Sequence, residues 1–272
     1  MKRFCARVAA AMFALCACAA AAWAEPGGYS RPIDVSLDGH RSDFLFDLVT
    51  IFIGILFLIM VAVLFWASIA HRQREGHKAL YDHGVSKKHL VFTAVLAGAI
   101  FFGVDGTALV HSADDIANGF FKFPDKDPNV VNVEVYGQQW AWNFRYAGAD
   151  GKFNTPDDVL TLNELHVPLD KPIYLKIKSK DVIHSFYLPN FRVKQDAMPG
   201  SITRLWFEAK KPGHFEIGCA QHCGANHYKM RGWITIESQA DYDQWLKDEA
   251  QSAQRRYDEA DSDAHWGWDW ES

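Results

Sequence analysis

Two long apolar stretches in the first half of the chain limit what it can fold into. Residues 48–69 contain no charged side chain, and residues 90–110 contain one, Asp105, toward their C-terminal end. A helix of roughly 20 apolar residues is enough to cross the ~30 Å hydrocarbon core of a bilayer. We therefore expect a hairpin of two transmembrane helices over residues 44–110, with spans at about 44–70 and 90–110. Asp105 is either a functional acid or a solvated or packing residue near the interface, and the sequence leaves both interpretations open.

Basic residues between the two spans predict how the hairpin is oriented. The connecting segment carries Arg72, Arg74, Lys78, Lys87 and Lys88. Cytoplasmic loops of membrane proteins carry an excess of lysine and arginine. We expect a multi-pass protein of the bacterial inner (plasma) membrane, with this loop in the cytoplasm and the C-terminal domain in the periplasm.

Residues 1–24 have the pattern of a cleaved signal peptide. Basic residues near the start are followed by an apolar stretch and then by small residues at Ala22-Trp23-Ala24. The run Leu15-Cys16-Ala17-Cys18 is a weaker match to a lipoprotein cleavage site. Cleavage after Ala24 removes three of the five cysteines and leaves residues 25–43 as a periplasmic N-terminal segment.

The region after the second span has the pattern of β-structure. Short β-rich runs, separated by Gly, Pro and Asp clusters, occur at 130–136, 140–146, 173–179, 202–207, 215–217 and 233–236. Such runs predict a β-sandwich domain over residues 111–238. A helix is expected at 241–253, within a C-terminal segment, 239–272, that ends in an acidic tail rich in tryptophan.

The charge of this region argues against nucleic acid as a partner. Residues 112–272 carry 25 acidic and 18 basic side chains, a net charge of −7. Nucleic-acid-binding domains are usually basic, so no nucleic-acid partner is expected. An acidic surface would instead attract a basic protein.

Soft metal ligands are concentrated in twelve residues of the C-terminal half. They are Cys219, Cys223, His227 and Met230, and His184 lies upstream as a further candidate. Thiolate and imidazole groups select copper or zinc, and a thioether favours copper. Glycines interrupt the segment and β-rich runs flank it, which predicts a loop between two strands. The spacing also fits one face of a helix, and that alternative stays open.

The two cysteines allow more than one interpretation. In an exported protein they can form a disulfide. One cysteine with two histidines would hold a single copper ion, whereas two thiolates can bridge two metal ions.

With these residues in view, the chain resembles subunit II of the haem-copper cytochrome c oxidases, which carries a binuclear copper A centre. The resemblance extends from about residue 44 to residue 236. It includes the aromatic stretch Gly-Gln-Gln-Trp-Ala-Trp-Asn-Phe-Arg-Tyr at 137–146 and Asp-Ala-Met-Pro-Gly at 196–200. The resemblance implies an N-terminal two-helix transmembrane hairpin plus an all-β cupredoxin-like sandwich domain. It also implies that electrons enter through Trp140.

The resemblance further implies a ligand set and a role. Both cysteines, Cys219 and Cys223, would bridge two copper ions, while each histidine would bind one of them. The remaining weak ligands would be Met230 and the main-chain carbonyl of Gln221. The centre would pass electrons to the haem-copper subunit I, which reduces oxygen to water. Other oxidase subunits and membrane lipid would be further partners of the chain. The electron donor would be a cytochrome c or a membrane-bound haem protein or quinol-oxidising complex.

Three features depart from the pattern of that family. Gln221 replaces a glutamate whose side chain also reaches a magnesium ion at the subunit boundary, and a neutral amide is a poorer ligand for a hard cation. His89 replaces a glutamate at the mouth of a proton channel, so it is either a proton carrier or an interfacial residue. The acid-rich insert at 150–158 is either a solvated turn or a calcium site that lacks the full loop pattern.

Two other functions are consistent with these residues. One is the small subunit of a copper A nitric oxide reductase, because the choice of reaction belongs to the partner subunit. The other is a membrane-anchored copper carrier or assembly factor, although such carriers favour exposed clusters of methionine and histidine.

Overall fold

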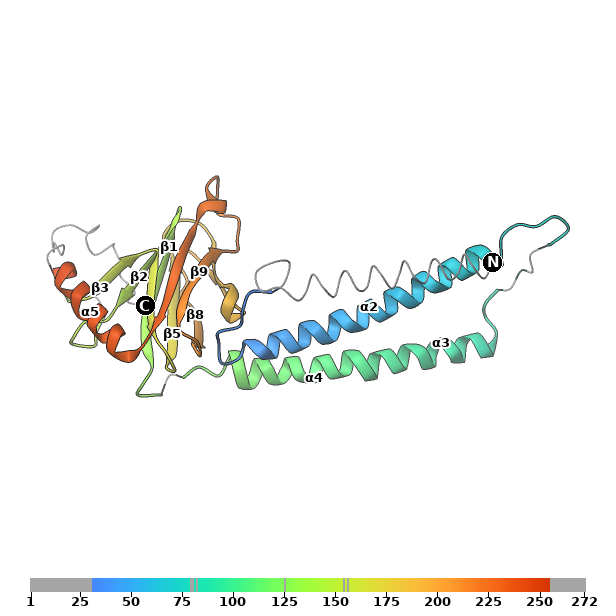
Figure 1. Ribbon diagram of the computed structural model, residues 1–272, viewed down its shortest axis with the longest axis horizontal. Coiled ribbons are helices and arrows are strands. Elements are labelled where there is room, and N and C mark those ends of the chain that lie inside the picture. Colours follow the sequence, from blue (N-terminus) through green and yellow to red (C-terminus); the bar gives the residue numbers. More distant parts are fainter. Residues whose placement is uncertain are drawn as a thin grey trace. The chain divides into compact units, whose positions relative to one another are not determined.

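The computed structural model describes residues 31–78, 81, 83–124, 126–153, 155 and 157–254 of the chain. The predicted signal peptide and the tryptophan-rich tail from residue 255 lie outside this range. Within it, the chain forms two compact units (Figure 1). One unit is His40–Phe123, and the other combines the residues up to Gly39 with those from Pro124 onward.

The first unit consists of two long helical segments. Helix α2 spans Gly39–Ala70, and the second segment spans Lys87–Phe120. The second segment contains α3 (Lys87–Ile100), α4 (Gly106–Asp114) and two π-helical stretches, η1 (Phe101–Asp105) and η2 (Asp115–Phe120). Both segments are long and apolar enough to cross a membrane. Both segments extend beyond the predicted spans. At 1.5 Å per residue a helix of 32 residues is about 48 Å long, which is more than the hydrocarbon core requires.

Polar groups at the helix ends lie outside the most apolar stretches. Arg41, in the first turn of α2, pairs with Asp115 at 2.9 Å and with Asp114 at 3.3 Å. This contact joins the start of α2 to the end of the second helical segment, as an antiparallel hairpin requires. Ser86 caps α3 by accepting a hydrogen bond from the main-chain nitrogen of His89. The side chain of Asp105 is exposed at the end of η1.

The second unit is a sandwich of two five-stranded sheets, which confirms the predicted fold class. The first sheet has the order β3-β2-β1-β5-β8, and the second has the order β4-β10-β9-β6-β7. The strands are β1 (Val131–Gln138), β2 (Ala141–Tyr146), β3 (Val159–Leu162), β4 (Glu164–Pro168), β5 (Pro172–Ser179), β6 (His184–Leu188), β7 (Val193–Ala197), β8 (Thr203–Glu208), β9 (Gly213–Cys219) and β10 (Arg231–Glu237). The six predicted β-rich runs fall on β1, β2, β5, β8, β9 and β10; the other four strands were not predicted.

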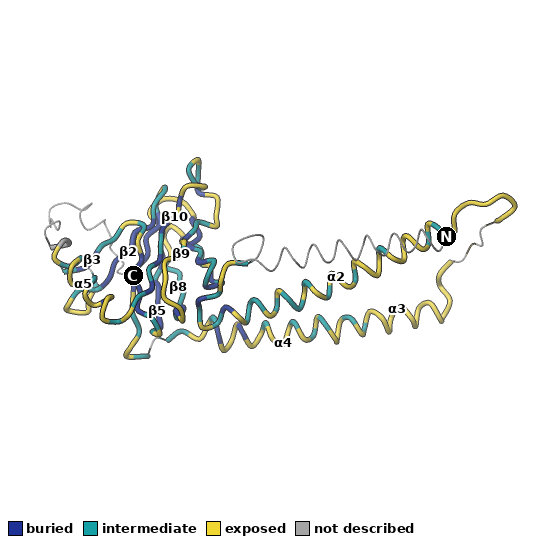
Figure 2. The backbone as a smooth tube through the Cα atoms, in the orientation of Figure 1, coloured by how far each residue is buried: buried dark blue, intermediate teal, exposed yellow. Residues whose placement is uncertain are grey.

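Alternating apolar residues of the two sheets form the core. Figure 2 shows that buried residues are concentrated in the strands of this unit. In β2, for example, Trp142, Phe144 and Tyr146 point into the core, since successive side chains of a strand face opposite sides. The Trp142 ring packs edge-on against Phe186 of β6, at 5.2 Å between ring centroids. The sheet that carries β2 is thereby fixed against the sheet that carries β6.

Helix α5 (Gln239–Gln254) includes the helix predicted at 241–253 and packs on the sandwich. Its first turn is capped by Ser238, whose hydroxyl oxygen accepts a hydrogen bond from the main-chain nitrogen of Asp241. Trp245 stacks on His166 of β4 with ring centroids 4.1 Å apart, and its edge contacts Tyr146. One aromatic side chain therefore anchors the helix to both sheets.

The acid-rich insert between β2 and β3 supplies a partner for a buried arginine. Arg145 is almost fully buried; its Nε donates to Glu134 at 2.8 Å and lies 3.6 Å from Asp158 of the insert. The guanidinium group of Arg145 lies 5.8 Å from the centre of the Phe153 ring. Because a buried cation needs paired anions, the insert has a clear structural role here. A calcium ion at 150–158 stays a prediction.

Candidate metal centre

Two neighbouring strands and one loop bring the predicted ligands together. His184 begins β6, and Cys219 ends β9, which pairs with β6 through Phe186 and Cys219. After Cys219 the chain forms a loop that returns as β10, with a single 3₁₀ turn at His227–Lys229. The segment is thus a loop between strands, as predicted, and the helical alternative is wrong. Among the described residues, the group with metal-ligand geometry is His184, Cys219 and Cys223, whose donor atoms lie within 4.8 Å of one another.

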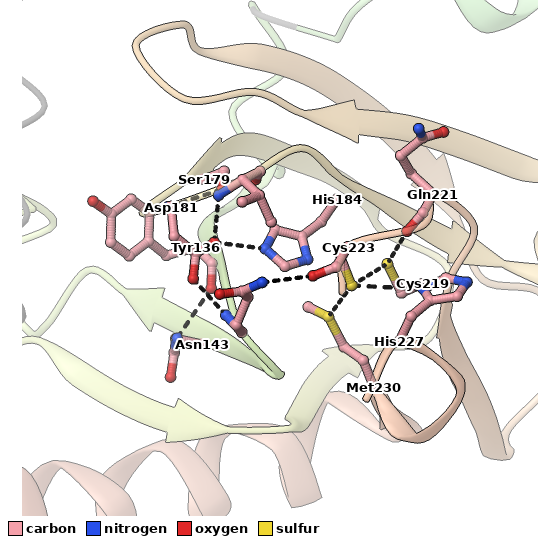
Figure 3. Close-up of polar contacts among 12 residues, drawn as sticks. Tyr136, Asn143, Ser179, Asp181, His184, Cys219, Gln221, Cys223, His227 and Met230 are labelled. Atoms are coloured by element: carbon pink, nitrogen blue, oxygen red, sulfur yellow. Dashed lines mark hydrogen bonds and ion pairs between the residues drawn. The ribbon is translucent and has the colours of Figure 1, made fainter. Parts of the chain in front are cut away.

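The remaining predicted ligands surround the same point (Figure 3). The two cysteine sulfurs are 3.8 Å apart, which is nearly twice the length of a disulfide bond, so both thiols are free in this structure. The Cys223 sulfur lies 3.5 Å from His227 Nδ1 and 3.7 Å from the Met230 sulfur. The main-chain carbonyl oxygen of Gln221 lies 3.2 Å from the Cys219 sulfur. Its side chain is exposed and points away from the sulfurs.

One histidine nitrogen is left available to a metal ion. His184 Nε2 lies 2.8 Å from the carboxylate of Asp181, while Nδ1 is buried and has no hydrogen-bond partner among the described residues. A buried polar atom without a partner is costly unless something binds it. A soft metal ion beside the thiols would satisfy Nδ1, and the carboxylate on the opposite nitrogen fixes the ring orientation. The residues present therefore fit a soft metal ion.

Gly137 makes room for this histidine. A Cβ atom at position 137 would lie 3.1 Å from His184 Cδ2 and 3.1 Å from Trp142 Cζ3. Both rings are fully buried and cannot move aside easily. This glycine of the aromatic stretch is therefore a packing requirement of the site.

Trp140 lies in the turn between β1 and β2, against the ligand loop. A Cβ atom on Gly224 would lie 3.2 Å from Trp140 Cζ2 and 2.8 Å from Gln139 Nε2. Gln139 Nε2 donates a hydrogen bond of 2.7 Å to the carbonyl of Cys223. The indole is thus next to the residue that follows a candidate ligand. Sequence reasoning missed Gln139 and Asp181, although one is adjacent to Trp140 and the other precedes His184 by three residues.

The electrostatics of the site favour one thiolate. Burial alone would raise the pKa of Cys219. The neighbouring imidazole of His184, together with hydrogen bonds to the main chain, outweighs the effect of burial and lowers this pKa to about 6. Burial and the neighbouring charge of Cys219 raise the pKa of Cys223. At Asp181, burial is outweighed by hydrogen bonds from His184, Gln139 and Val182, which lower the pKa of its carboxyl group. The site therefore presents an anionic sulfur at neutral pH.

Alkylation of the reduced, metal-free protein should show this difference. Only a thiolate reacts with iodoacetamide, so the rate of modification of Cys219 should rise with a midpoint near pH 6, while Cys223 stays protected. Peptide mapping by mass spectrometry separates the two positions, and Cys223→Ser serves as the control. A midpoint near pH 8.5, the value of an ordinary thiol, would contradict the assignment.

His89 is not part of this site. It lies in the first turn of α3, in the other compact unit, where it is exposed. Its role in proton transfer stays a prediction.

Comparisons with known proteins point to one family. Residues 131–238 match the family model described as cytochrome C oxidase subunit II, periplasmic domain. The chain is 32% identical over 215 residues to "Alternative cytochrome c oxidase subunit 2" of Bradyrhizobium diazoefficiens, covering 70% of this chain and 74% of that protein. It is 38% identical over 146 residues to "Cytochrome c oxidase subunit 2" of Thermostichus vulcanus, covering 53% of this chain and only 41% of that protein.

One solved structure aligns with part of the chain. The crystal structure of the periplasmic domain of subunit II of cytochrome oxidase of Bradyrhizobium japonicum aligns with a TM-score of 0.41 and 28% identity. The alignment covers 45% of this chain and 94% of that domain.

Proposed function

Because this chain belongs to the cytochrome c oxidase subunit II family, we propose that its metal site holds a binuclear copper A centre within a respiratory oxidase. Bound copper would supply one-electron redox chemistry between an electron donor and the haem-copper subunit that reduces oxygen to water. Cys219 and Cys223 would hold it through their thiolates, and His184 and His227 would each supply one imidazole nitrogen. Met230 and the main-chain carbonyl of Gln221 would be weak ligands.

The observation that carries the proposal is the convergence of six donor groups from two distant segments. Two sulfurs 3.8 Å apart suit a shared bridging role, and the thioether sulfur and second imidazole lie within 3.7 Å of one of them. Zinc sites seldom use a thioether, and a mononuclear copper site needs only one thiolate. A binuclear copper site uses all the donors present.

The protein part of the mechanism is to hold these ligands still. Bound copper would supply a metal pair that stores and releases one electron without breaking bonds. His184 and Cys219 lie on paired strands of a sandwich, and His184, Cys223 and Met230 are buried. Fixed ligands in a water-poor setting reorganise little when the charge changes, which favours rapid electron transfer.

Burial also separates this proposal from the copper-carrier alternative. A carrier must release its metal to a partner and therefore exposes its ligands. Here the exposed fractions of Cys223 and Met230 are 3% and 2%, and that of His184 is zero. This geometry suits a permanent centre.

The remaining features of the proposal concern location and partners. The two apolar helices would anchor the chain in a bacterial inner membrane, with the sandwich in the periplasm beside subunit I. The net charge of −7 on residues 112–272 would attract a basic cytochrome c as the electron donor. A membrane-bound haem protein and a quinol-oxidising complex are the other donors to test.

Copper loading of the full-length protein in detergent tests the proposal directly. We expect two copper ions per chain and the electron paramagnetic resonance signal of a delocalised mixed-valence pair. One copper ion per chain with a mononuclear blue signature would contradict the binuclear assignment. Turnover of the purified complex on oxygen and on nitric oxide then distinguishes an oxidase from a nitric oxide reductase.

Gln221 leads to a separate prediction about a hard cation at the subunit boundary. Its main-chain carbonyl faces the Cys219 sulfur whatever its side chain is, so Gln221→Glu should leave the copper stoichiometry unchanged. Because a carboxylate binds hard cations better than an amide, the substitution should raise manganese affinity in the assembled complex roughly tenfold. Manganese is a paramagnetic probe for magnesium. Tight, stoichiometric manganese in the unsubstituted complex would show that other ligands suffice.

A further inference from the structure

A chain of three hydrogen bonds links the proposed copper ligands to the turn that carries Trp140, the proposed point of electron entry. One carboxylate oxygen of Asp181 lies 2.8 Å from His184 Nε2, and the other accepts a hydrogen bond of 2.7 Å from the main-chain nitrogen of Gln139. The side chain of Gln139 in turn donates to the carbonyl of Cys223 at 2.7 Å. Asp181 and Gln139 thus connect a histidine ligand, a cysteine ligand and the turn that carries Trp140. Figure 3 shows Asp181 beside His184.

The carboxylate itself is held in place by the turn between β5 and β6. Its Oδ1 accepts a hydrogen bond of 2.6 Å from the main-chain nitrogen of Val182. The hydroxyl group of Ser179 donates to the Val182 carbonyl and accepts from the nitrogen of Asp181. The side chain of Asp181 is 30% exposed, so it reaches the buried His184 from the surface. A rigid turn therefore supports the contact to His184.

We propose that Asp181 is a positioning residue that serves the copper ligand and the electron-accepting tryptophan together. Through Nε2 it orients the His184 ring so that Nδ1 faces the sulfurs. Through the Gln139 main chain it keeps the Gln139–Trp140 turn against Gly224 of the ligand loop, where the Gln139 side chain makes the second connection. This inference rests on the proposed function.

The contact between Asp181 and His184 and the contact between Gln139 and Cys223 should affect different properties, so an experiment can separate them. A negative charge hydrogen-bonded to a ligand imidazole increases the electron donation of that ligand and stabilises the oxidised metal pair. Loss of the charge should therefore raise the reduction potential. Loss of the Gln139 amide donor should leave the potential nearly unchanged and loosen the contact between Trp140 and the ligand loop, because only the position of the turn is affected.

The experiment compares Asp181→Asn and Gln139→Met in the full-length, copper-loaded protein. Asp181→Asn keeps the size and one oxygen acceptor but removes the charge. We expect a higher reduction potential in a redox titration, altered hyperfine coupling of the ligand nitrogen, and slower electron uptake from reduced soluble cytochrome c. Gln139→Met keeps the length and the neutral charge but cannot donate to the Cys223 carbonyl, so we expect uptake to slow by roughly tenfold at an unchanged potential.

Asp170→Asn is the matched control. It makes the same charge change in the same unit, at a side chain that is 61% exposed and pairs with Lys210, just before the start of β5. Asp181 follows the opposite end of that strand. The potential, the hyperfine coupling and the uptake rate of the control should equal those of the unsubstituted protein.

Two results would overturn the inference. One is an Asp181→Asn protein that differs from the unsubstituted one only in its affinity for cytochrome c, since that would make Asp181 a docking residue. The other is a potential shift as large in Asp170→Asn as in Asp181→Asn, which would reflect net charge alone. Failure of the unsubstituted protein to bind two copper ions would instead contradict the proposed function. Circular dichroism of each variant shows whether the sandwich is folded, and Asp181→Glu, which restores the charge, should restore the potential.

Discussion

Replacing either Cys219 or Cys223 with serine should abolish the binuclear centre and its delocalised mixed-valence signal completely. Two metal ions can share an electron through sulfur only if both thiolates bridge them, and serine supplies a harder oxygen donor that copper binds less well. The larger loss of total bound copper is expected in Cys223→Ser, because the Cys223 sulfur lies within 3.8 Å of three other donors: those of Cys219, His227 and Met230.

Copper analysis and electron paramagnetic resonance of the full-length variants check this expectation. Met230→Leu is the informative control, since a weak thioether ligand tunes the metal more than it holds it. That variant should keep two copper ions and shift the potential. A delocalised signal that survives in either serine variant would exclude a bridging role for that cysteine.

Replacing Trp140 with phenylalanine should slow electron uptake on the order of tenfold or more, equivalent to about 1.4 kcal/mol on the barrier. The indole of Trp140 belongs to the β1–β2 turn and lies against Gly224 of the ligand loop. Gly224 directly follows the candidate ligand Cys223. The smaller phenyl ring leaves a gap in that contact. Copper content and affinity for the donor should change little, because Trp140 is no ligand and the hydrogen bond from Gln139 to Cys223 does not involve it.

Stopped-flow mixing with reduced soluble cytochrome c measures the uptake rate, and metal analysis of the same sample measures copper. Trp245→Phe is a suitable control, because it alters a partly buried tryptophan of the same unit that anchors α5 instead. Loss of copper from the Trp140→Phe protein would mean that the residue is chiefly structural.

The fold was predictable where hydrophobic patterns were strong. The two helical segments follow from apolar stretches long enough to cross a membrane, and six strands follow from β-rich runs. Three of the four unpredicted strands, β3, β4 and β7, lie at sheet edges. Edge strands pair on one side only and often carry polar residues, as Lys194, Gln195 and Asp196 of β7 do, so their alternation is weak. The fourth, β6, begins with His184 and Ser185, polar residues in a fully buried position.

The candidate site divides in the same way. The types of ligand, and hence the preference for copper, could be predicted because four donors stand within twelve residues and the chemistry of a side chain does not depend on the fold. The acid-rich insert shows the opposite case: its composition predicted either a solvated turn or a calcium site, and neither interpretation includes the pairing of Asp158 with the buried Arg145, a partner that no local pattern indicates.

By itself, the sequence predicted two helices long and apolar enough to cross a membrane and a loop rich in soft metal ligands, since both properties depend on composition and short-range spacing. Only the tertiary structure decided which imidazole nitrogen of His184 faces the sulfurs, and which side chains support it. The contacts that decide this join residues far apart in the chain, with Gln139 bonded to groups 42 and 84 positions away. Such contacts exist only after strands from both sheets have packed, because packing brings the β1–β2 turn, the Asp181 turn and the ligand loop to one end of the sandwich.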